Sequence, residues 1–335
     1  MPRVLVTGGA GFIGAHTSAA LAAEGLEVVA VDPLRTYSYS LEAQHWHALR
    51  HRREVLLRDA RVVVASTENR DEMRRAVLDA RPDYILHLGA LPLATVARVS
   101  ADHAFESILR GTFNLIELAL ELGTVRKLVY VSSSMVYGDF TRSPMPETEP
   151  TAPKDVYGGM KLAGEVLVET FSRARGLPYA IVRPSAVYGP TDMNDRIVQR
   201  FVECALWSRP LTVVDPDSTV LDFSYVGDVA GGLTRALLSP VENETFNITA
   251  GEGRTLTELH ELLRARFPDM PVEVSERADD FRPRRGALDI AKARALLEYE
   301  PVYPLERGVG EYVDFLSSFP TEGPLVPTRA RGAAA

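Results

Sequence analysis

The strongest constraint on the fold is a regular alternation of short β-branched runs and helical patterns through the first half of the chain. The strand-like runs are Val4–Thr7, Val28–Val31, Val62–Val64, Tyr84–Leu88, Leu128–Ser132 and Tyr179–Arg183. The helical patterns between them are Ile13–Glu24, Glu72–Ala80, Phe105–Leu122 and Tyr157–Arg175. No hairpin signal separates consecutive strands, so we expect crossover connections and parallel strands. The sequence therefore predicts an α/β fold with a doubly wound parallel sheet that is covered by helices on both faces.

The second half of the chain has a less regular pattern. After Arg183-Pro184 prolines become frequent, and short strands such as Leu211–Val214 alternate with charged helical stretches. We therefore expect a larger domain over residues 1–184, to which the chain returns near 222–250, and a smaller mixed lobe over residues 185–317. Residues 318–335 are rich in Pro, Gly, Ala and Thr, and this composition predicts a disordered tail.

The composition is that of a globular protein, with 46% apolar and 24% charged residues. A formal net charge of −8 gives no electrostatic basis for binding nucleic acid or an anionic membrane. No apolar stretch approaches the roughly 18 residues of a membrane span, and Met1 to Val4 lack a signal-peptide pattern. The single cysteine, Cys204, excludes an internal disulfide framework and a cysteine-rich metal site. We expect a cytoplasmic protein without a metal, a nucleic-acid partner or a membrane partner.

Three glycines follow the first predicted strand and open the first predicted helix. Gly8, Gly11 and Gly14 recur at intervals of three, a spacing that lets backbone N–H groups approach a pyrophosphate at a helix N-terminus. Asp32 ends the second strand, where a carboxylate accepts hydrogen bonds from the adenosine ribose and repels a 2′-phosphate. The pattern predicts NAD rather than NADP, although Arg35 nearby is a mild signal for NADP.

A second constellation consists of Ser133, at the carboxyl end of a predicted strand, and Tyr157 with Lys161 on a predicted helix. The i, i+4 spacing places the tyrosine and the lysine on one helix face. A tyrosine with a pKa of about 10 is a poor base at neutral pH, but a lysine ammonium and a positively charged nicotinamide would favour the phenolate. Tyr157 could then take a proton from a substrate hydroxyl while the carbon beneath gives hydride to NAD, and Ser133 would hydrogen-bond the same oxygen.

Seven segments, in their order and spacing, resemble the extended short-chain dehydrogenases/reductases of the NAD-dependent epimerase/dehydratase type, typified by UDP-galactose 4-epimerase. They are Thr7–Gly14, His87–Ala90, Val131–Gly138, Tyr157–Lys161, Arg183–Pro190, Leu221–Val229 and Arg285–Ala293. The resemblance implies a Rossmann domain for NAD, a smaller lobe for a nucleotide-diphosphate sugar, and Ser133, Tyr157 and Lys161 as the catalytic set. It also implies a homodimer formed by a bundle of the helices at Phe105–Leu122 and Tyr157–Arg175.

Together with the motifs above, the resemblance assigns residues to two sites. The cofactor set is Gly8, Gly11, Phe12, Ile13, Gly14, Asp32, Ser66, Leu88, Gly89, Ala90, Tyr157, Lys161 and Pro184. The substrate set is Ser134, Met135, Tyr157, Ser185, Ala186, Arg282 and Arg285. Of the two arginines, Arg285 is favoured for the diphosphate. Ser66 rests on an alignment in which Ala65-Ser66 replaces the Gly-Asp that contacts adenine, and Asp59 is the alternative if the register differs.

On the substrate side the chain departs from the family pattern. Ser134 and Met135 stand where dehydratases carry Asp-Glu, and the glutamate usual in sugar-acid decarboxylases is missing too. Ala186 replaces the Asn of Arg-Pro-Phe-Asn-Val-Tyr-Gly, and Leu221 replaces an arginine that often binds the diphosphate. The redox residues are therefore complete, whereas several substrate contacts have changed.

These observations lead to three hypotheses. The favoured one is an NAD-dependent nucleotide-sugar epimerase that acts at C4 through a transient 4-keto intermediate, since the catalytic set is complete and the dehydratase acids are absent. The alternative, suggested by Ala186 and Leu221, is an NAD(P)-dependent dehydrogenase or reductase of a nucleotide sugar or another polyol, with the same catalytic set. A dinucleotide-binding scaffold is disfavoured because such relatives usually lose the tyrosine or the lysine.

Overall fold

The computed structural model describes residues 1–35, 43–91, 94–275 and 283–319. Within these ranges seven strands form one parallel sheet in the order β3-β2-β1-β4-β5-β6-β9. The strand order reverses between β1 and β4, and sheets of this kind bind ligands beyond the carboxyl ends of the strands at such a point. The predicted doubly wound parallel sheet is confirmed.

The first part of the chain alternates strands with helices or helical turns. Its elements are β1 (Arg3–Thr7), α1 (Phe12–Ala23), β2 (Glu27–Asp32), α2 (Ala43–His51), η1 (Arg52–Leu56), β3 (Ala60–Val64), α3 (Arg70–Ala80), β4 (Tyr84–His87), α4 (Ala94–Val99), α5 (Ala101–Ala104), η2 (Phe105–Arg110), α6 (Gly111–Leu122), β5 (Lys127–Val131), η3 (Ser134–Tyr137), α7 (Val156–Arg175) and β6 (Tyr179–Arg183). The second part contains α8 (Ile197–Trp207), β7 (Leu211–Val214), β8 (Val220–Asp222), α9 (Val226–Leu238), β9 (Glu244–Asn247), β10 (Gly253–Thr255), α10 (Leu256–Arg264), β11 (Val272–Ser275), α11 (Ala291–Leu297) and α12 (Leu305–Ser317).

Buried side chains alternate between the two faces of the sheet because successive residues of a strand point to opposite sides. On β1, Val4 and Val6 pack into a cluster that contains residues of α1 and α9, whereas Leu5 packs into the opposite cluster with residues of α3, α6 and α7. The helices follow the same division, since α1 packs on α9 and α6 packs on both α3 and α7. Both faces are therefore covered, and the loops at the carboxyl ends of the strands remain for function.

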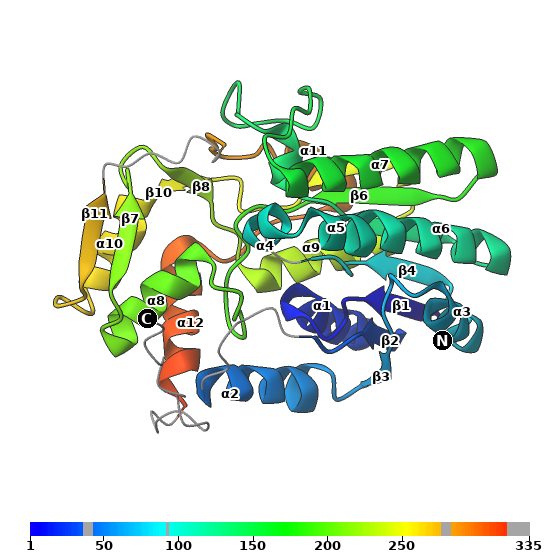
Figure 1. Ribbon diagram of the computed structural model, residues 1–335, viewed down its shortest axis with the longest axis horizontal. Coiled ribbons are helices and arrows are strands. Elements are labelled where there is room, and N and C mark those ends of the chain that lie inside the picture. Colours follow the sequence, from blue (N-terminus) through cyan, green and yellow to red (C-terminus); the bar gives the residue numbers. More distant parts are fainter. Residues whose placement is uncertain (36–42, 92–93, 276–282, 320–335) are drawn as a thin grey trace, which may run out of the picture.

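The lobe has a core of its own. Phe201 of α8, Leu211 of β7, Leu259 of α10 and Tyr312 of α12 belong to one buried cluster that is separate from the two sheet clusters. Its short strands form an antiparallel pair, β10 with β8, and a parallel pair, β11 with β7. In Figure 1, β7, β11, α8 and α10 gather at the left, away from β1 to β3. Strand β9 lies beside β6 at the edge of the main sheet.

Some boundaries differ from the sequence expectation. The helix expected over Phe105–Leu122 begins as a wide π-helical turn, η2, which leads directly into α6. Strand β4 ends at His87, and β5 ends at Val131, so Leu88 and Ser132 lie in the loops at the carboxyl edge. Residues 320–335 of the expected tail lie outside the described residues. Among the helices of the described ranges, none has the length and apolar character needed to cross a membrane.

Candidate active site

The glycine turn after β1 presents backbone N–H groups at the N-terminus of α1. Gly8 has a φ of +67°, a conformation that favours glycine. A Cβ at Gly14 would lie 2.0 Å from the Gly8 carbonyl oxygen, so a larger residue would push the helix away from the turn. Gly11 is the N-cap of α1 and provides no side-chain cap to the helix that begins with Phe12 and Ile13. The N–H groups of the first turn are therefore available to an anion such as a pyrophosphate.

Thr7 joins this turn to the loop after β4. Its hydroxyl accepts a hydrogen bond from the Gly89 N–H at 3.1 Å and lies 2.6 Å from Nδ1 of His87. Burial lowers the pKa of His87 to about 3, so its ring is neutral at physiological pH. A Cβ on Gly8 would lie 2.9 Å from the Gly89 nitrogen. The loop Leu88–Ala90, expected to contact the cofactor, thus packs directly against the glycine turn.

Asp32 is fixed at the end of β2 by backbone donors. Its Oδ2 accepts a hydrogen bond from the Ala10 N–H at 3.2 Å, and its Oδ1 accepts one from the Leu34 N–H at 2.8 Å. Burial raises the pKa of Asp32, and these hydrogen bonds act in the opposite direction. Each carboxylate oxygen can accept a further hydrogen bond. The side chain is therefore able to bind the hydroxyls of a ribose.

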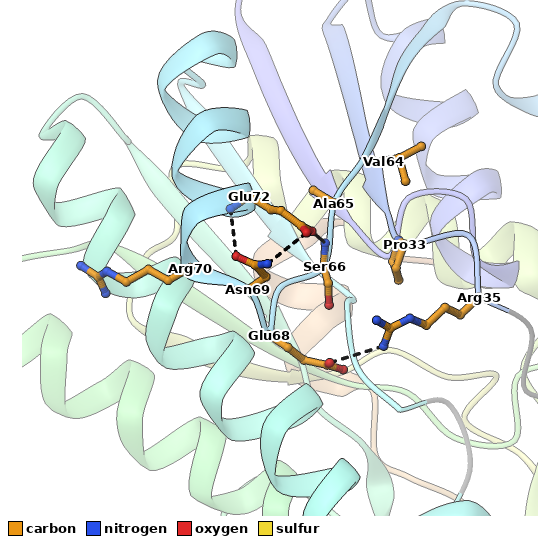
Figure 2. A pocket seen from close by; sticks show the side chains of 9 residues that line it. All are labelled: Pro33, Arg35, Val64, Ala65, Ser66, Glu68, Asn69, Arg70 and Glu72. Atoms are coloured by element: carbon orange, nitrogen blue, oxygen red, sulfur yellow. Dashed lines mark hydrogen bonds and ion pairs between the residues drawn. The ribbon is translucent and has the colours of Figure 1, made fainter.

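A cavity of about 660 Å³ opens at the carboxyl ends of β2 and β3, next to Pro33, the residue that follows Asp32 (Figure 2). It is lined by Pro33, Arg35, Val64, Ala65, Ser66, Glu68, Asn69, Arg70 and Glu72. The Ser66 N–H donates to Oε2 of Glu72 at 2.9 Å, and the Asn69 side chain caps α3, so the cavity wall is well anchored. The position suits the adenosine end of a dinucleotide whose pyrophosphate lies at the glycine turn.

Ser133, Tyr157 and Lys161 meet at the carboxyl end of β5. Ser133 is the N-cap of η3, where its Oγ accepts a hydrogen bond from the Met135 N–H at 3.2 Å, and its hydroxyl is near enough to the Tyr157 phenol to lower the pKa of that group. One helical turn along α7, the Lys161 Nζ lies 6.0 Å from the centroid of the Tyr157 ring. The same Nζ donates to the carbonyl of Val131 at 2.8 Å. Strand β5 and helix α7 thus bring the three expected catalytic side chains together.

Burial dominates the protonation of this group. Lys161 is 4% exposed, and burial lowers its pKa to about 7, against the opposing effect of the Glu165 carboxylate. Burial also raises the pKa of Tyr157 above its usual value, while the positive charge of Arg196 and the nearby Ser133 hydroxyl lower it. A cation that the sequence analysis did not identify, Arg196, therefore acts on the phenol.

Arg196 lies at the start of α8. Its Cζ is 5.7 Å from the centroid of the Phe12 ring, and its Nη1 donates to the carbonyl of Val187 at 3.3 Å. Phe12 begins α1, so this arginine lies near both the glycine turn and Tyr157. No motif in the sequence marks it, because its position depends on how the lobe packs on the sheet domain.

A buried ion pair lies behind Lys161. Glu165, one turn further along α7, accepts two hydrogen bonds from Arg183 of β6, Nε to Oε1 at 2.9 Å and Nη2 to Oε2 at 2.6 Å. Arg183 also donates to the Tyr137 hydroxyl at 2.9 Å, which donates to Oδ1 of Asn247 at 2.9 Å. The sequence analysis missed Glu165, although it continues the four-residue spacing of the two catalytic candidates on α7.

The residues expected to bind substrate differ in exposure. Ser134 and Ser185 are 1% and 3% exposed, and the Ser134 N–H donates to the carbonyl of Pro184 at 2.9 Å. The side chains of both serines are therefore buried in this structure. Met135 and Ala186 are partly exposed, and Ala186 has a φ of +37°.

The two expected diphosphate arginines come from the segment before α11. Arg285 is partly exposed, and the preceding Arg284 accepts a hydrogen bond at its carbonyl from the Phe140 N–H at 2.8 Å. This contact places Arg285 beside the loop that follows η3. Arg282 lies outside the described residues. Leu221 on β8 is 5% exposed and brings no charge to the lobe surface.

A comparison with known protein families decides where the chain belongs. The family described as the NAD dependent epimerase/dehydratase family matches residues 4–249. This chain belongs to that family. NAD, the family's cofactor, fits the residues present. The glycine turn leaves open a space that a Cβ at Gly14 would fill, and the N-terminus of α1 lacks a side-chain cap.

Two relatives and one solved structure illustrate the family. A UDP-glucose 4-epimerase of Mycolicibacterium smegmatis is 31% identical, over 93% of this chain and 98% of its own length. UDP-glucuronic acid decarboxylase 1 of Danio rerio is 28% identical, over 94% of this chain and 72% of its own length. The crystal structure of the Thermus thermophilus UDP-glucose 4-epimerase in complex with NAD has a TM-score of 0.81 and 30% identity, covering 94% of this chain and 99% of that one. The resemblance stated from the motifs is confirmed, and the relatives include both epimerases and decarboxylases.

Proposed function

We propose that this chain is an NAD-dependent nucleotide-sugar epimerase that acts at C4. The observation that carries the proposal is the meeting of Ser133, Tyr157 and Lys161 at the carboxyl end of β5, two strands from the glycine turn in the sheet order. An acid–base group beside a dinucleotide site is what the reversible oxidation of a secondary hydroxyl needs. Relatives named as UDP-glucose 4-epimerases support a UDP-sugar as the substrate class.

In this proposal Tyr157 takes the proton of the sugar 4-hydroxyl, and Ser133 hydrogen-bonds the same oxygen. Because burial raises the pKa of Tyr157, nearby positive charge is needed to stabilise the phenolate, and Arg196 and Lys161 supply it from the chain. NAD, held at the glycine turn and Asp32, would supply a reversible hydride acceptor for C4. Tyr157 holds the proton while the 4-keto sugar turns its other face, and gives it back to the oxygen when the hydride returns.

Decarboxylation and dehydration are less well supported by this site. Positions 134 and 135, which follow the catalytic serine, are a buried serine and a methionine. Neither can act as a carboxylate acid or base beside the sugar, and loss of water requires such a group. We therefore place epimerisation ahead of both reactions.

A second candidate is a net dehydrogenase or reductase with the same catalytic set. Ala186 has no hydrogen-bonding side chain, and Leu221 is buried, so two positions that bind substrate in the resembled family offer neither an amide nor a charge here. This favours a substrate with fewer polar groups at those places, such as a polyol without a diphosphate. Such an enzyme would consume one nicotinamide per turnover, whereas an epimerase regenerates it.

A proton NMR time course with UDP-, dTDP- and GDP-sugars and only trace NAD separates the two candidates. Interconversion of C4 epimers without net NADH would support the epimerase and identify the substrate. Product formation that requires stoichiometric nicotinamide would support the dehydrogenase or reductase instead. The matched control is Tyr157→Phe, which should bind NAD and give neither product.

We also propose that two copies of the chain pair through α6 and α7. Phe113 of α6 and Phe171 of α7 form an edge-to-face contact with centroids 6.0 Å apart. Phe113 is 37% exposed and Val166 of α7 is 53% exposed, and exposed apolar side chains on adjacent helices are typical of interfaces.

Light scattering should give twice the chain mass for the wild type, and Val166→Glu should lower the measured mass. A monomeric wild type would contradict the proposed dimer. The cytoplasmic location stays a prediction from the sequence.

A further inference from the structure

Arg35 lies where an arginine could bind a 2′-phosphate. It follows Asp32 by three residues and lines the cavity at the carboxyl ends of β2 and β3. In dinucleotide sites of this fold, an arginine near the end of the second strand accommodates the 2′-phosphate of NADP. Here, however, the side chain extends across the cavity toward Glu68, and its Nη1 lies 3.4 Å from Oε2 of that residue (Figure 2).

Glu68 is held in place from several directions. The buried Asn114 of α6 donates its side-chain N–H groups to the carbonyls of Thr67 at 3.0 Å and Glu68 at 3.3 Å. On its other side, Oε1 of Glu68 lies 3.5 Å from Nε2 of His103 on α5. The carboxylate therefore projects from an anchored loop and lies between two basic side chains.

The ion pair matters for its position more than for its strength. The Arg35 side chain is 53% exposed, and an ion pair so exposed to solvent contributes little to the stability of the fold. Glu68, at 23% exposed, is the more shielded partner. A 2′-phosphate carries a charge of about −2, and one that reached Arg35 would have to displace the Glu68 carboxylate while also lying close to Asp32. Two carboxylates would therefore oppose it.

We propose that Glu68 is a specificity-determining residue of the dinucleotide site. Its carboxylate forms an ion pair with Arg35 and places a negative charge where the 2′-phosphate of NADP would bind. The site therefore selects NAD. The inference rests on the proposed dinucleotide site and deepens it. It assigns the choice between NAD and NADP to Glu68 as well as Asp32, and it resolves the conflict between Asp32 and Arg35 that the sequence presents.

Equilibrium binding of NAD and NADP to the purified full chain, measured by calorimetry, tests this role. Glu68→Gln keeps the size of the side chain and removes its charge, which frees Arg35 for a phosphate. We expect its affinity for NADP to rise by roughly tenfold to a hundredfold, the usual effect of gaining a charged hydrogen bond. Its affinity for NAD should change by less than about threefold, because NAD has no 2′-phosphate and the carboxylate expected to bind its ribose, Asp32, is unchanged.

Two further variants separate a local effect from a general one. Asp71→Asn removes the same charge from an exposed position of α3 that does not line the cavity, and it should leave NADP affinity unchanged. Arg35→Gln in the Glu68→Gln background should abolish the gain. The inference is overturned if the wild type binds NADP as tightly as NAD, if Glu68→Gln gains nothing, or if the gain appears equally in Asp71→Asn or persists without Arg35. A wild type that binds neither dinucleotide overturns the proposed function together with the inference, whereas NAD binding without an NADP gain overturns the inference alone.

Discussion

Replacing Lys161 by methionine tests the burial of a charge at the centre of the site. The side chain is 4% exposed, and burial lowers its pKa from the usual 10.5 to about 7. In the unfolded chain the lysine keeps its usual pKa, so below about pH 7 folding has to bury an ammonium ion. One pKa unit corresponds to about 1.4 kcal/mol, so the buried ion lowers the free energy of unfolding by about 5 kcal/mol in that range.

The pH dependence has a definite sign. The folded-state pKa is below that of the unfolded chain, so between about pH 7 and 10.5 the unfolded chain binds more protons and the stability of the wild type rises with pH. In Lys161→Met the Val131 carbonyl loses a hydrogen bond, which costs about 1 kcal/mol at every pH. We therefore expect the variant to be more stable than the wild type by about 4 kcal/mol near pH 6 and by about 1 kcal/mol near pH 9. Its turnover should be lost.

Urea unfolding followed by circular dichroism, at several values between pH 6 and pH 9, measures this difference. Lys154→Met is the matched control, because Lys154 is exposed and paired with Asp139 at 3.0 Å, and its stability difference should stay small at every pH. A Lys161→Met difference that changes by less than about 1 kcal/mol across the range would refute the reasoning, as would a variant that is less stable throughout.

Three further substitutions test other parts of the site. Tyr157→Phe should lower turnover by at least about a hundredfold and leave NAD affinity unchanged, because it removes the proton acceptor alone. Steady-state kinetics and calorimetry would measure the two quantities, and substantial residual activity would contradict the assigned role. Gly14→Ala should weaken NAD binding by about tenfold or more and destabilise the fold by about 1–3 kcal/mol, because its Cβ would lie 2.0 Å from the Gly8 carbonyl oxygen; an unchanged Kd and Tm would refute this. Glu165→Gln should destabilise the protein by about 3–5 kcal/mol, because it leaves the buried Arg183 without its counter-charge, and urea unfolding would test this against the milder effect expected for an exposed glutamate.

The sequence predicts much of the sheet domain because local signals agree with the tertiary structure there. β-branched runs bury both faces of each central strand, and Gly123 and Gly176 end α6 and α7 in the left-handed conformation that glycine favours. The glycine turn and the pair Tyr157 and Lys161 lie on elements whose spacing determines their geometry. Ser133 follows a strand, so the sheet order brings it to the same edge.

Contacts between distant segments were harder to predict. Glu165 and Arg183 are 18 residues apart, and nothing local shows that α7 packs its acidic residue against β6. Arg196 reaches Phe12 only because the lobe folds back over α1. The interaction of Arg35 with Glu68 joins the loops after β2 and β3, so its effect on the cofactor site depends on side-chain placement that a motif cannot specify.

The most direct test of the account follows deuterium from C4 of a UDP-hexose labelled at that position. If Tyr157 holds the proton while hydride leaves C4 and returns to it, the C4 epimer should form with the deuterium retained at C4 and with none in solvent or in released NADH. Deuterium that accumulates in reduced cofactor would contradict the epimerase account and indicate a dehydrogenase. Deuterium that is lost to water would show that the C4–H bond is not broken by hydride transfer to a retained dinucleotide.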